Sequence, residues 1–210
     1  MSKLDGFNAI APFYDFLKRI VFGNELSNSE QAFFHMLPLS GNVLVLGGGS
    51  GDLLIPLLAE RPALTVRYVE ASSAMVERAR AKLPEGHLTN VTFIHGDEDS
   101  IPNDIQFDCV ILPFILDVFG EVELGGVCRR IRLALMPGGL CLVTDFVNSG
   151  KRWQSLLLWI MYKFFSWVAG IKARSLPDWK KALITSGLTP VKHKPFFHNF
   201  IESWVFTRPS

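Results

Sequence analysis

A glycine-rich turn follows the first strongly apolar run of the chain. Residues 42–46 predict a short strand, and Gly47-Gly48-Gly49-Ser50-Gly51 comes directly after it. Glycine permits positive φ angles and lets a ligand approach the backbone without meeting a Cβ atom. Asp52 stands where a dinucleotide fingerprint needs its last glycine, and no Lys-Ser/Thr pair of a phosphate loop follows. The turn therefore predicts a ligand-binding loop of another kind.

Carboxylates close two of the later apolar runs. Glu70 ends the second run, about 20 residues beyond the glycines, where an acidic residue accepts hydrogen bonds from ribose hydroxyls in nucleotide-binding sheets. Asp97 and Glu98 follow the third run, at 91–94, and a carboxylate there can accept a hydrogen bond from an adenine amino group. These residues predict a nucleoside site, and solvated surface acids are the alternative interpretation.

Strands and helices alternate around these residues, which predicts right-handed crossovers and an open, mostly parallel α/β sheet. Ligands bind such sheets beyond the carboxyl ends of the strands, where the glycines and acids lie. The predicted strands are 42–46, 65–69, 91–94, 107–112 and 140–144, and the predicted helices between them are 53–58, 73–83 and 124–135.

Both ends of the chain add further elements. Residues 1–38 carry aromatic and aliphatic side chains at three- and four-residue steps and predict a helical cap. Residues 178–186 predict a short helix. The runs 188–195 and 202–207 predict two strands whose short connection indicates an antiparallel pair. We therefore expect a single domain, with the cap at 1–38, a core at 42–146, an apolar helix within 150–176, and a helix and hairpin at 177–210.

The composition excludes several classes of protein. With 49% apolar and 20% charged residues in 210, a disordered chain is excluded, and a domain of this size buries a core without disulfides. The three cysteines are isolated, which indicates a reducing compartment and no metal site. The N-terminus shows no basic stretch followed by an apolar signal core, so we expect a cytoplasmic protein.

Five segments in this order resemble the successive motifs of class I S-adenosylmethionine-dependent methyltransferases. They are VLVLGGGSG, YVEASSAM, FIHGDEDSIP, FDCVILPFILDVF and LMPGGLCLVTDF. The opening FNAIAPFYDFL is similar to the cap helix of the quinone-biosynthesis (UbiE/MenG-like) branch. The resemblance covers about half of the chain. It implies a Rossmann-like seven-stranded sheet in the order 3-2-1-4-5-7-6 with the last strand antiparallel.

The resemblance also implies S-adenosylmethionine as cofactor and assigns residues to it. The glycines would line its methionine and ribose parts, Glu70 would take the ribose hydroxyls, and Ala71 would pack on the adenine. Asp97, with Glu98 beside it, would bind the adenine amino group. The implied cofactor residues are Tyr14, Gly47, Gly48, Gly49, Gly51, Glu70, Ala71, Asp97, Glu98, Pro113 and Phe114.

One position departs from the family pattern, and the catalytic residues are left open. The family usually has an acid two residues before the first glycine, where this chain has Val45, and Asp52 is a candidate to replace it. A base is needed only if the acceptor must lose a proton. The candidates are Asp117 after the fourth strand, Asp145 at the end of the fifth, and His198 before the last strand. Each also has an ordinary structural interpretation.

Residues 153–169 form an apolar helical stretch. Trp153, Leu156, Leu157, Ile160 and Met161 begin one apolar stripe, and the other face carries Leu158, Trp159 and Lys163. Seventeen helical residues span about 25 Å, which is short of a bilayer core. We expect a lid over an apolar substrate. Core packing, a homodimer surface and a peripheral membrane contact stay open.

The sequence thus predicts methyl transfer to a small, largely apolar acceptor that is quinone-like, aromatic or lipid-like. A nucleic-acid or protein methyltransferase is one alternative, because residues from Lys151 onward include ten Lys or Arg and only two acids. No flipped-base motif follows the fourth strand, so we expect no nucleic-acid partner. A non-catalytic cofactor-binding module is a second alternative, and a nicotinamide-dependent oxidoreductase is disfavoured by Asp52.

Overall fold

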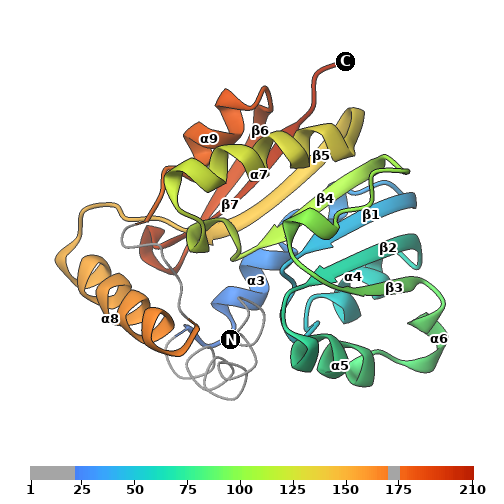
Figure 1. Ribbon diagram of the computed structural model, residues 1–210, viewed down its shortest axis with the longest axis horizontal. Coiled ribbons are helices and arrows are strands. Elements are labelled where there is room, and N and C mark those ends of the chain that lie inside the picture. The colour runs from blue at the N-terminus through green and yellow to red at the C-terminus, as the bar shows by residue number, and fades with distance from the viewer. Residues whose placement is uncertain (1–21, 170–175) are drawn as a thin grey trace.

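Seven strands form one sheet in the order β3-β2-β1-β4-β5-β7-β6 in the computed structural model, which describes residues 22–169 and 176–210 (Figure 1). Strands β1 to β5 run parallel, and β7 is antiparallel to both β5 and β6. The predicted order and the antiparallel last strand are confirmed. The strands are β1 Ser40–Leu46, β2 Ala63–Glu70, β3 Val91–His95, β4 Phe107–Pro113, β5 Leu135–Phe146, β6 Thr189–Phe196 and β7 Ile201–Thr207.

Helices and short 3-10 turns connect the strands. The α-helices are α3 Glu25–Gln31, α4 Leu54–Glu60, α5 Ser73–Lys82, α6 Glu85–Leu88, α7 Glu121–Ala134, α8 Arg152–Ala169 and α9 Trp179–Thr185. The 3-10 turns are η2 Phe34–Met36, η3 Glu98–Ser100, η4 Leu116–Val118 and η5 Phe197–Asn199. No helix in the described ranges has the length and apolar character that a bilayer crossing needs.

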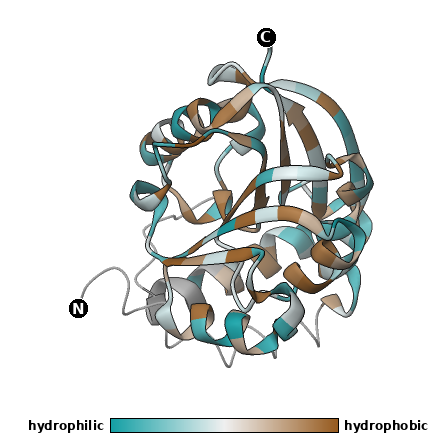
Figure 2. Cartoon of the chain, turned by 90° about the vertical axis from the view of Figure 1, so that its right-hand side faces the viewer, coloured by the Kyte–Doolittle hydropathy of each residue, from teal (hydrophilic) through white to brown (hydrophobic). Residues whose placement is uncertain are grey.

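Alternate side chains of the buried strands point to opposite faces of the sheet and pack into two separate cores. Leu44 and Leu46 of β1 pack on one face with the apolar sides of α7 and α9. Val43 and Val45 point to the other face, where η2, α4 and the end of α5 cover the sheet. The hydropathy colouring shows largely apolar central strands between mixed helices (Figure 2). The result is a three-layer α/β sandwich whose parallel strands are buried on both sides.

Strand β5 begins earlier than the sequence predicts. Leu135 pairs with Phe107 of β4, and the ladder resumes only at Leu140, which pairs with Cys109. The Pro-Gly-Gly segment between these pairs lies within the strand as an irregularity, although Pro and Gly in the sequence indicate a break. The Gly138 N–H donates to the Arg208 carbonyl at 2.8 Å, which ties this segment to the residue after β7.

A third apolar cluster lies at the end of the sheet where β5 finishes. It joins Phe146 of β5 and Phe200 before β7 to Phe22, and α8 contributes Leu158 and Met161. The Phe22 and Phe200 rings are stacked with centroids 6.2 Å apart. We call these five residues the aromatic cluster. Figure 1 shows α8 standing beyond this edge of the sheet.

The orientation of α8 differs in part from the predicted stripe. Met161 is buried as expected, but Leu156 and Ile160 of that stripe are exposed, and Leu158 from the opposite predicted face is buried. Gln154 is also fully buried. Gln154 lies on the same side of the helix as Leu158 and Met161 and makes hydrogen bonds that are described below. Periodicity of apolar residues alone does not reveal this orientation, because apolar residues lie on both sides of this helix.

Part of the predicted N-terminal cap is described. Helix α3 is held against the sheet by the Ser29 carbonyl, which accepts hydrogen bonds from the hydroxyls of Ser203 at 2.7 Å and Thr144 at 3.2 Å. All three residues are buried. This contact fixes α3 against β5 and β7. Tyr14, the one cofactor residue predicted from the cap, lies outside the described residues.

Candidate active site

The glycine loop after β1 leaves one position open. Gly47, Gly49 and Gly51 have positive φ angles of 72°, 62° and 77°. A Cβ atom at Gly47 would lie 2.7 Å from the Ile115 side chain, and one at Gly51 would lie 2.5 Å from Ala79 of α5. A Cβ atom at Gly49 would meet nothing within 4 Å. Two glycines therefore let the loop pack against the protein, whereas Gly49 borders space in which a ligand can reach the backbone.

Glu70 closes β2 directly beside this open position. Glu70 is 7% exposed, and its carboxylate accepts hydrogen bonds from the N–H groups of Gly49 and Ser72, both at 2.9 Å. Burial raises the pKa of the Glu70 carboxyl, and the N–H groups of Ser72 and Gly49 oppose that rise. A carboxylate has about four lone-pair sites, so two contacts leave acceptor capacity for hydroxyl donors of a ligand. The two predicted elements, glycine loop and acid, are thus joined.

Tyr68 supports the loop from below, and the sequence interpretation missed it. Its buried hydroxyl donates to the Gly49 carbonyl at 2.7 Å. A Cβ atom at Gly48 would lie 2.4 Å from the Tyr68 ring, so this glycine is required for close packing. The available signal was the position of Tyr68 two residues before Glu70, because alternate residues of a strand share a face.

The loop after β3 lies next to Ala71, the residue that follows Glu70. The His95 ring nitrogen Nε2 lies 3.1 Å from the Ala71 carbonyl oxygen. Asp97 is half-buried, and its carboxylate accepts an N–H group two residues further along at 3.1 Å. The Glu98 carbonyl accepts from Arg130 of α7 at 2.9 Å. The structure therefore brings the predicted ribose and adenine residues to neighbouring strand ends.

The segment after β4 turns sharply. Pro113 ends the strand, and Phe114 has a φ of +53°, a left-handed conformation that is uncommon for a bulky side chain. The Phe114 N–H donates to the Thr144 carbonyl at 2.7 Å, and its ring lies 5.0 Å from the ring of Phe146. Such strain often occurs at ligand sites. Here it packs the Phe114 ring against the aromatic cluster.

Two of the candidate bases are buried side by side. Asp145 is fully buried and accepts the N–H groups of Leu116 at 2.8 Å, Asp117 at 3.3 Å and Phe146 at 2.8 Å. Burial raises the pKa of Asp145 to about 7, against those three N–H groups. Burial, and then the Asp145 charge, raise the pKa of Asp117 well above its usual value. Asp145 thereby anchors the turn after β4, and the pair can retain a proton near neutral pH.

His198 occupies a different environment from this pair. It is exposed, in the turn between β6 and β7, and its ring lies 6.4 Å from that of Trp153. Phe197, His198 and Asn199 have positive φ angles of 42°, 55° and 63°. The turn lies at the same edge of the sheet as the end of β5, because Phe146 and Phe196 both pair with Ile201.

Gln154 connects this turn to α8, and the sequence held no signal for it. Its Nε2 donates to the carbonyls of His198 at 3.3 Å and Asn199 at 3.4 Å. Its Oε1 accepts from the N–H and the hydroxyl of Ser149, both at 2.8 Å. This buried amide pins the first turn of α8 to the β6–β7 turn and sets which side of the helix faces the aromatic cluster.

The position that departs from the family pattern is filled by the core. Val45 is fully buried, in the core beneath the glycine loop. The Asp52 carboxylate lies 2.6 Å from Lys82 Nζ and accepts the Ser50 hydroxyl at 3.1 Å. Asp52 is therefore engaged with Lys82, and its predicted role toward a ligand stays a prediction. In the described ranges, no three His, Cys, Asp or Glu side chains gather as a metal site.

The sequence of this chain matches a protein family and several known proteins. Residues 43–139 match the family described as "Methyltransferase domain". The chain is 32% identical over 144 residues to a demethylmenaquinone methyltransferase of Thermotoga maritima, which is 67% of this chain and 60% of that protein. It is 33% identical over 105 residues to aclacinomycin 10-hydroxylase RdmB of Streptomyces purpurascens, covering 50% of this chain and 28% of that one. The chain spans less than two thirds of either relative.

A solved structure shares the fold over the whole chain. The 1,6-didemethyltoxoflavin-N1-methyltransferase of Burkholderia thailandensis superimposes with a TM-score of 0.69 at 15% identity, covering 99% of this chain and 88% of that one. It was solved with 1,6-didemethyltoxoflavin and S-adenosylhomocysteine bound. The chain therefore contains a segment that matches a methyltransferase domain, and the solved structure shows that it shares the fold of a methyltransferase.

Proposed function

We propose that the chain binds S-adenosylmethionine at the carboxyl edge of its sheet and transfers the methyl group to a small, largely apolar acceptor. The observation that carries the proposal is the junction of the glycine loop with Glu70. The open side of Gly49 and the buried carboxylate adjoin each other, joined by a hydrogen bond of 2.9 Å. Backbone that a ligand can reach, next to a buried acceptor, suits an adenosyl group.

The remaining cofactor residues follow the strand ends. Glu70 accepts the ribose hydroxyls, Ala71 packs on the adenine, and Asp97 with Glu98 beside it binds the adenine amino group. The glycine loop and the backbone at Pro113 and Phe114 line the methionine part. Support comes from the adjacency of these segments, since His95 reaches the Ala71 carbonyl and Ile115 lies against Gly47.

The acceptor site is proposed at the aromatic cluster. The Phe114 ring packs at a tilt beside the ring of Phe146, and the cluster also includes Leu158 and Met161 of α8. An apolar wall excludes water and suits an aromatic or quinone-like molecule. The name of the Thermotoga maritima relative, a demethylmenaquinone methyltransferase, agrees with such an acceptor.

Bound S-adenosylmethionine supplies an electrophilic sulfonium methyl group. The chain contributes alignment of the acceptor with that methyl group and a dry site. Where the acceptor loses a proton, Asp145 of the buried pair is the candidate to receive it, because its pKa is raised to about 7 and so lies near neutral pH. Burial raises the pKa of Asp117 well above its usual value, which favours the protonated form of that acid. The exposed His198 is the second candidate.

Calorimetry with S-adenosylmethionine and S-adenosylhomocysteine tests the cofactor site. Glu70→Gln keeps the shape of the side chain but removes its charge, so we expect both ligands to bind at least about tenfold more weakly, or roughly 1.4 kcal/mol. Glu85→Gln, on an exposed glutamate of α6, is the matched control and retains full affinity. If the unaltered protein binds neither ligand, the proposal fails.

An acceptor panel separates the remaining alternatives. We expect turnover with quinols or phenols and none with RNA, DNA or peptides. Methylation of a nucleic acid or a peptide would replace the proposed acceptor class. Tight binding of cofactor without turnover on any acceptor would favour a non-catalytic module. Another reaction also has to be tested, since one relative carries the name of a hydroxylase.

A further inference from the structure

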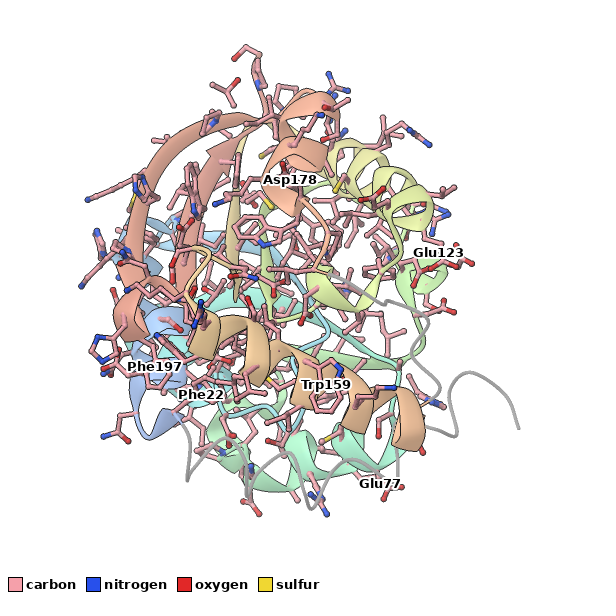
Figure 3. All side chains as sticks on the ribbon, turned by 90° about the vertical axis from the view of Figure 1, so that its left-hand side faces the viewer. Phe22, Glu77, Glu123, Trp159, Asp178 and Phe197 are labelled. Carbon is pink, nitrogen blue, oxygen red and sulfur yellow. The ribbon has the colours of Figure 1, made fainter. Side chains whose placement is uncertain are left out.

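The outward side of α8 between Arg152 and Lys163 is an exposed apolar surface. Leu156 and Trp159 are each 58% exposed, Ile160 is 47% exposed and Trp153 is 39% exposed. Figure 3 shows α8 across the near side of the molecule with Trp159 on its outward face. Isolated exposed apolar residues are ordinary, but four within three turns of one helix form a patch that predicts a partner.

The charges of this segment are all positive. Arg152 and Lys163 are exposed, and residues 151–163 contain no Asp or Glu. A helix turns by about 100° per residue, so Arg152 and Lys163 lie on the same side as Leu156 and Trp159, about 16 Å apart. The apolar patch is therefore framed along the helix by a basic side chain at each end.

The opposite side of the same helix is fixed to the protein. Leu158 and Met161 are buried in the aromatic cluster, and Gln154 holds the first turn to the carbonyls of His198 and Asn199. The division into a buried side and an outward side is thus set by packing and by hydrogen bonds. The outward residues therefore lie on a helix whose other side is packed against the protein.

We propose that the face formed by Arg152, Trp153, Leu156, Trp159, Ile160 and Lys163 docks on an anionic lipid surface. A helix that lies in the plane of a membrane interface has this arrangement of exposed aliphatic residues, tryptophan and flanking Lys or Arg. The long basic side chains reach lipid phosphates while their stems cover apolar surface. The 18 residues of α8 span about 27 Å, which is short of a bilayer core, and Leu158 and Met161 pack into the aromatic cluster.

Charge favours lipid over a second copy of the chain. If two α8 faces packed on each other, basic ends would meet basic ends in either orientation, because this face carries no acidic residue. Like charges at close range oppose association. An anionic lipid surface instead supplies negative charge and an apolar layer together. The inference does not depend on methyl transfer, although it would bring an apolar acceptor in the bilayer next to the aromatic cluster.

Sedimentation of the full chain with vesicles tests this inference. The probes are phosphatidylcholine vesicles with and without phosphatidylserine, at low and at high salt. We expect binding to the anionic vesicles that weakens with salt. Arg152→Gln/Lys163→Gln should weaken it by about fivefold per charge, which corresponds to roughly 1 kcal/mol for each basic residue. Leu156→Ser/Trp159→Ser should weaken it by at least about tenfold.

The matched control removes an exposed apolar and an exposed basic residue elsewhere. Val122→Ser/Arg129→Gln does so on α7, where Val122 is 93% exposed, and it should bind vesicles as the unaltered chain does. All variants should retain the melting temperature and the cofactor affinity, which separates this test from that of the proposed function. Equal binding by all variants, or no binding to anionic vesicles, would overturn the inference. So would a concentration-dependent dimer, without lipid, that Leu156→Ser/Trp159→Ser abolishes.

Discussion

The carboxyl edge of the sheet has two halves, and different chemical groups form each of them. The half at β1 and β2 is formed largely by the backbone of the glycine loop, whose glycines have positive φ angles. The Tyr68 hydroxyl supports this loop, and the buried Glu70 carboxylate accepts two N–H groups beside it. The half at β5 and β7 has the aromatic cluster, and a pair of buried acids lies after β4 and near the end of β5. Backbone geometry tolerates few substitutions, whereas an apolar wall accepts many. This difference agrees with our proposal that the cofactor binds at the first half and the acceptor at the second.

The largest effect is expected in the backbone half. Gly51→Ala forces a side chain onto a φ of +77° and against Ala79, so we expect the free energy of unfolding to fall by about 3 kcal/mol. Urea denaturation measures this loss. Gly125→Ala within α7, where the nearest atom to an added Cβ is 3.8 Å away, is the control and should not destabilise. An unchanged midpoint for Gly51→Ala would contradict the packing role of this glycine.

Gly49→Ala tests whether the cofactor binds beside Gly49, independently of the packing role of Gly51 in the same loop. Its added Cβ meets no protein atom, so we expect a stability loss of only about 1 kcal/mol from the positive φ. The methyl group would occupy the space assigned to the cofactor, and calorimetry should show at least about tenfold weaker binding, or roughly 1.4 kcal/mol. Full affinity would place the ligand elsewhere than at Gly49.

We expect the buried pair Asp117 and Asp145 in the second half to make the stability of the protein depend on pH. Because burial raises the pKa of both acids in the folded state, the folded protein holds their protons more tightly than the unfolded chain does. Their contribution to stability is present in full below about pH 4 and is lost as the pH rises, for Asp145 through about 7. Asp117→Asn removes one acid and its repulsion of Asp145. We therefore expect the decrease in unfolding free energy from pH 5 to pH 8 to shrink by at least about 1 kcal/mol.

Urea denaturation at both pH values measures that change. Glu121→Gln, on an exposed residue at the start of α7, should leave the pH dependence as it is. If Asp117→Asn and the unaltered chain lose the same stability over this range, the two buried acids do not interact as their positions indicate.

The smallest effect is expected at the β6–β7 turn. His198→Asn keeps a residue that tolerates the left-handed conformation, so stability should change by less than about 0.5 kcal/mol. Turnover with a phenolic acceptor should also be retained, since we assign proton transfer first to Asp145 of the buried pair. A large loss of turnover with unchanged cofactor affinity would instead identify His198 as the base and move the chemistry to the surface turn.

Local sequence signals predicted the backbone half well. The glycine turn, Glu70 and the acids after β3 each follow an apolar run directly, and parallel strands bring their ends to one edge, so their neighbourhood follows from order along the chain. The antiparallel last pair was predictable because only a short connection, 196–201, joins the two predicted strands. Strand β5 was predicted too short, because the pairing of Leu135 with Phe107 depends on a neighbouring strand and not on the Pro-Gly-Gly segment itself.

The sequence by itself predicted the strands, the glycine loop and the acid that adjoins it, because these depend on periodicity and on backbone rules that act over a few residues. The sheet order was implied by the resemblance to a family. Only the tertiary structure decided that Tyr68 supports the loop, that Asp117 and Asp145 share a buried site, and that Gln154 turns one side of α8 inward. The environment of a side chain is set by what packs on it from distant parts of the chain. For that reason its pKa, its exposure and the outward face of an apolar helix are properties of the folded protein.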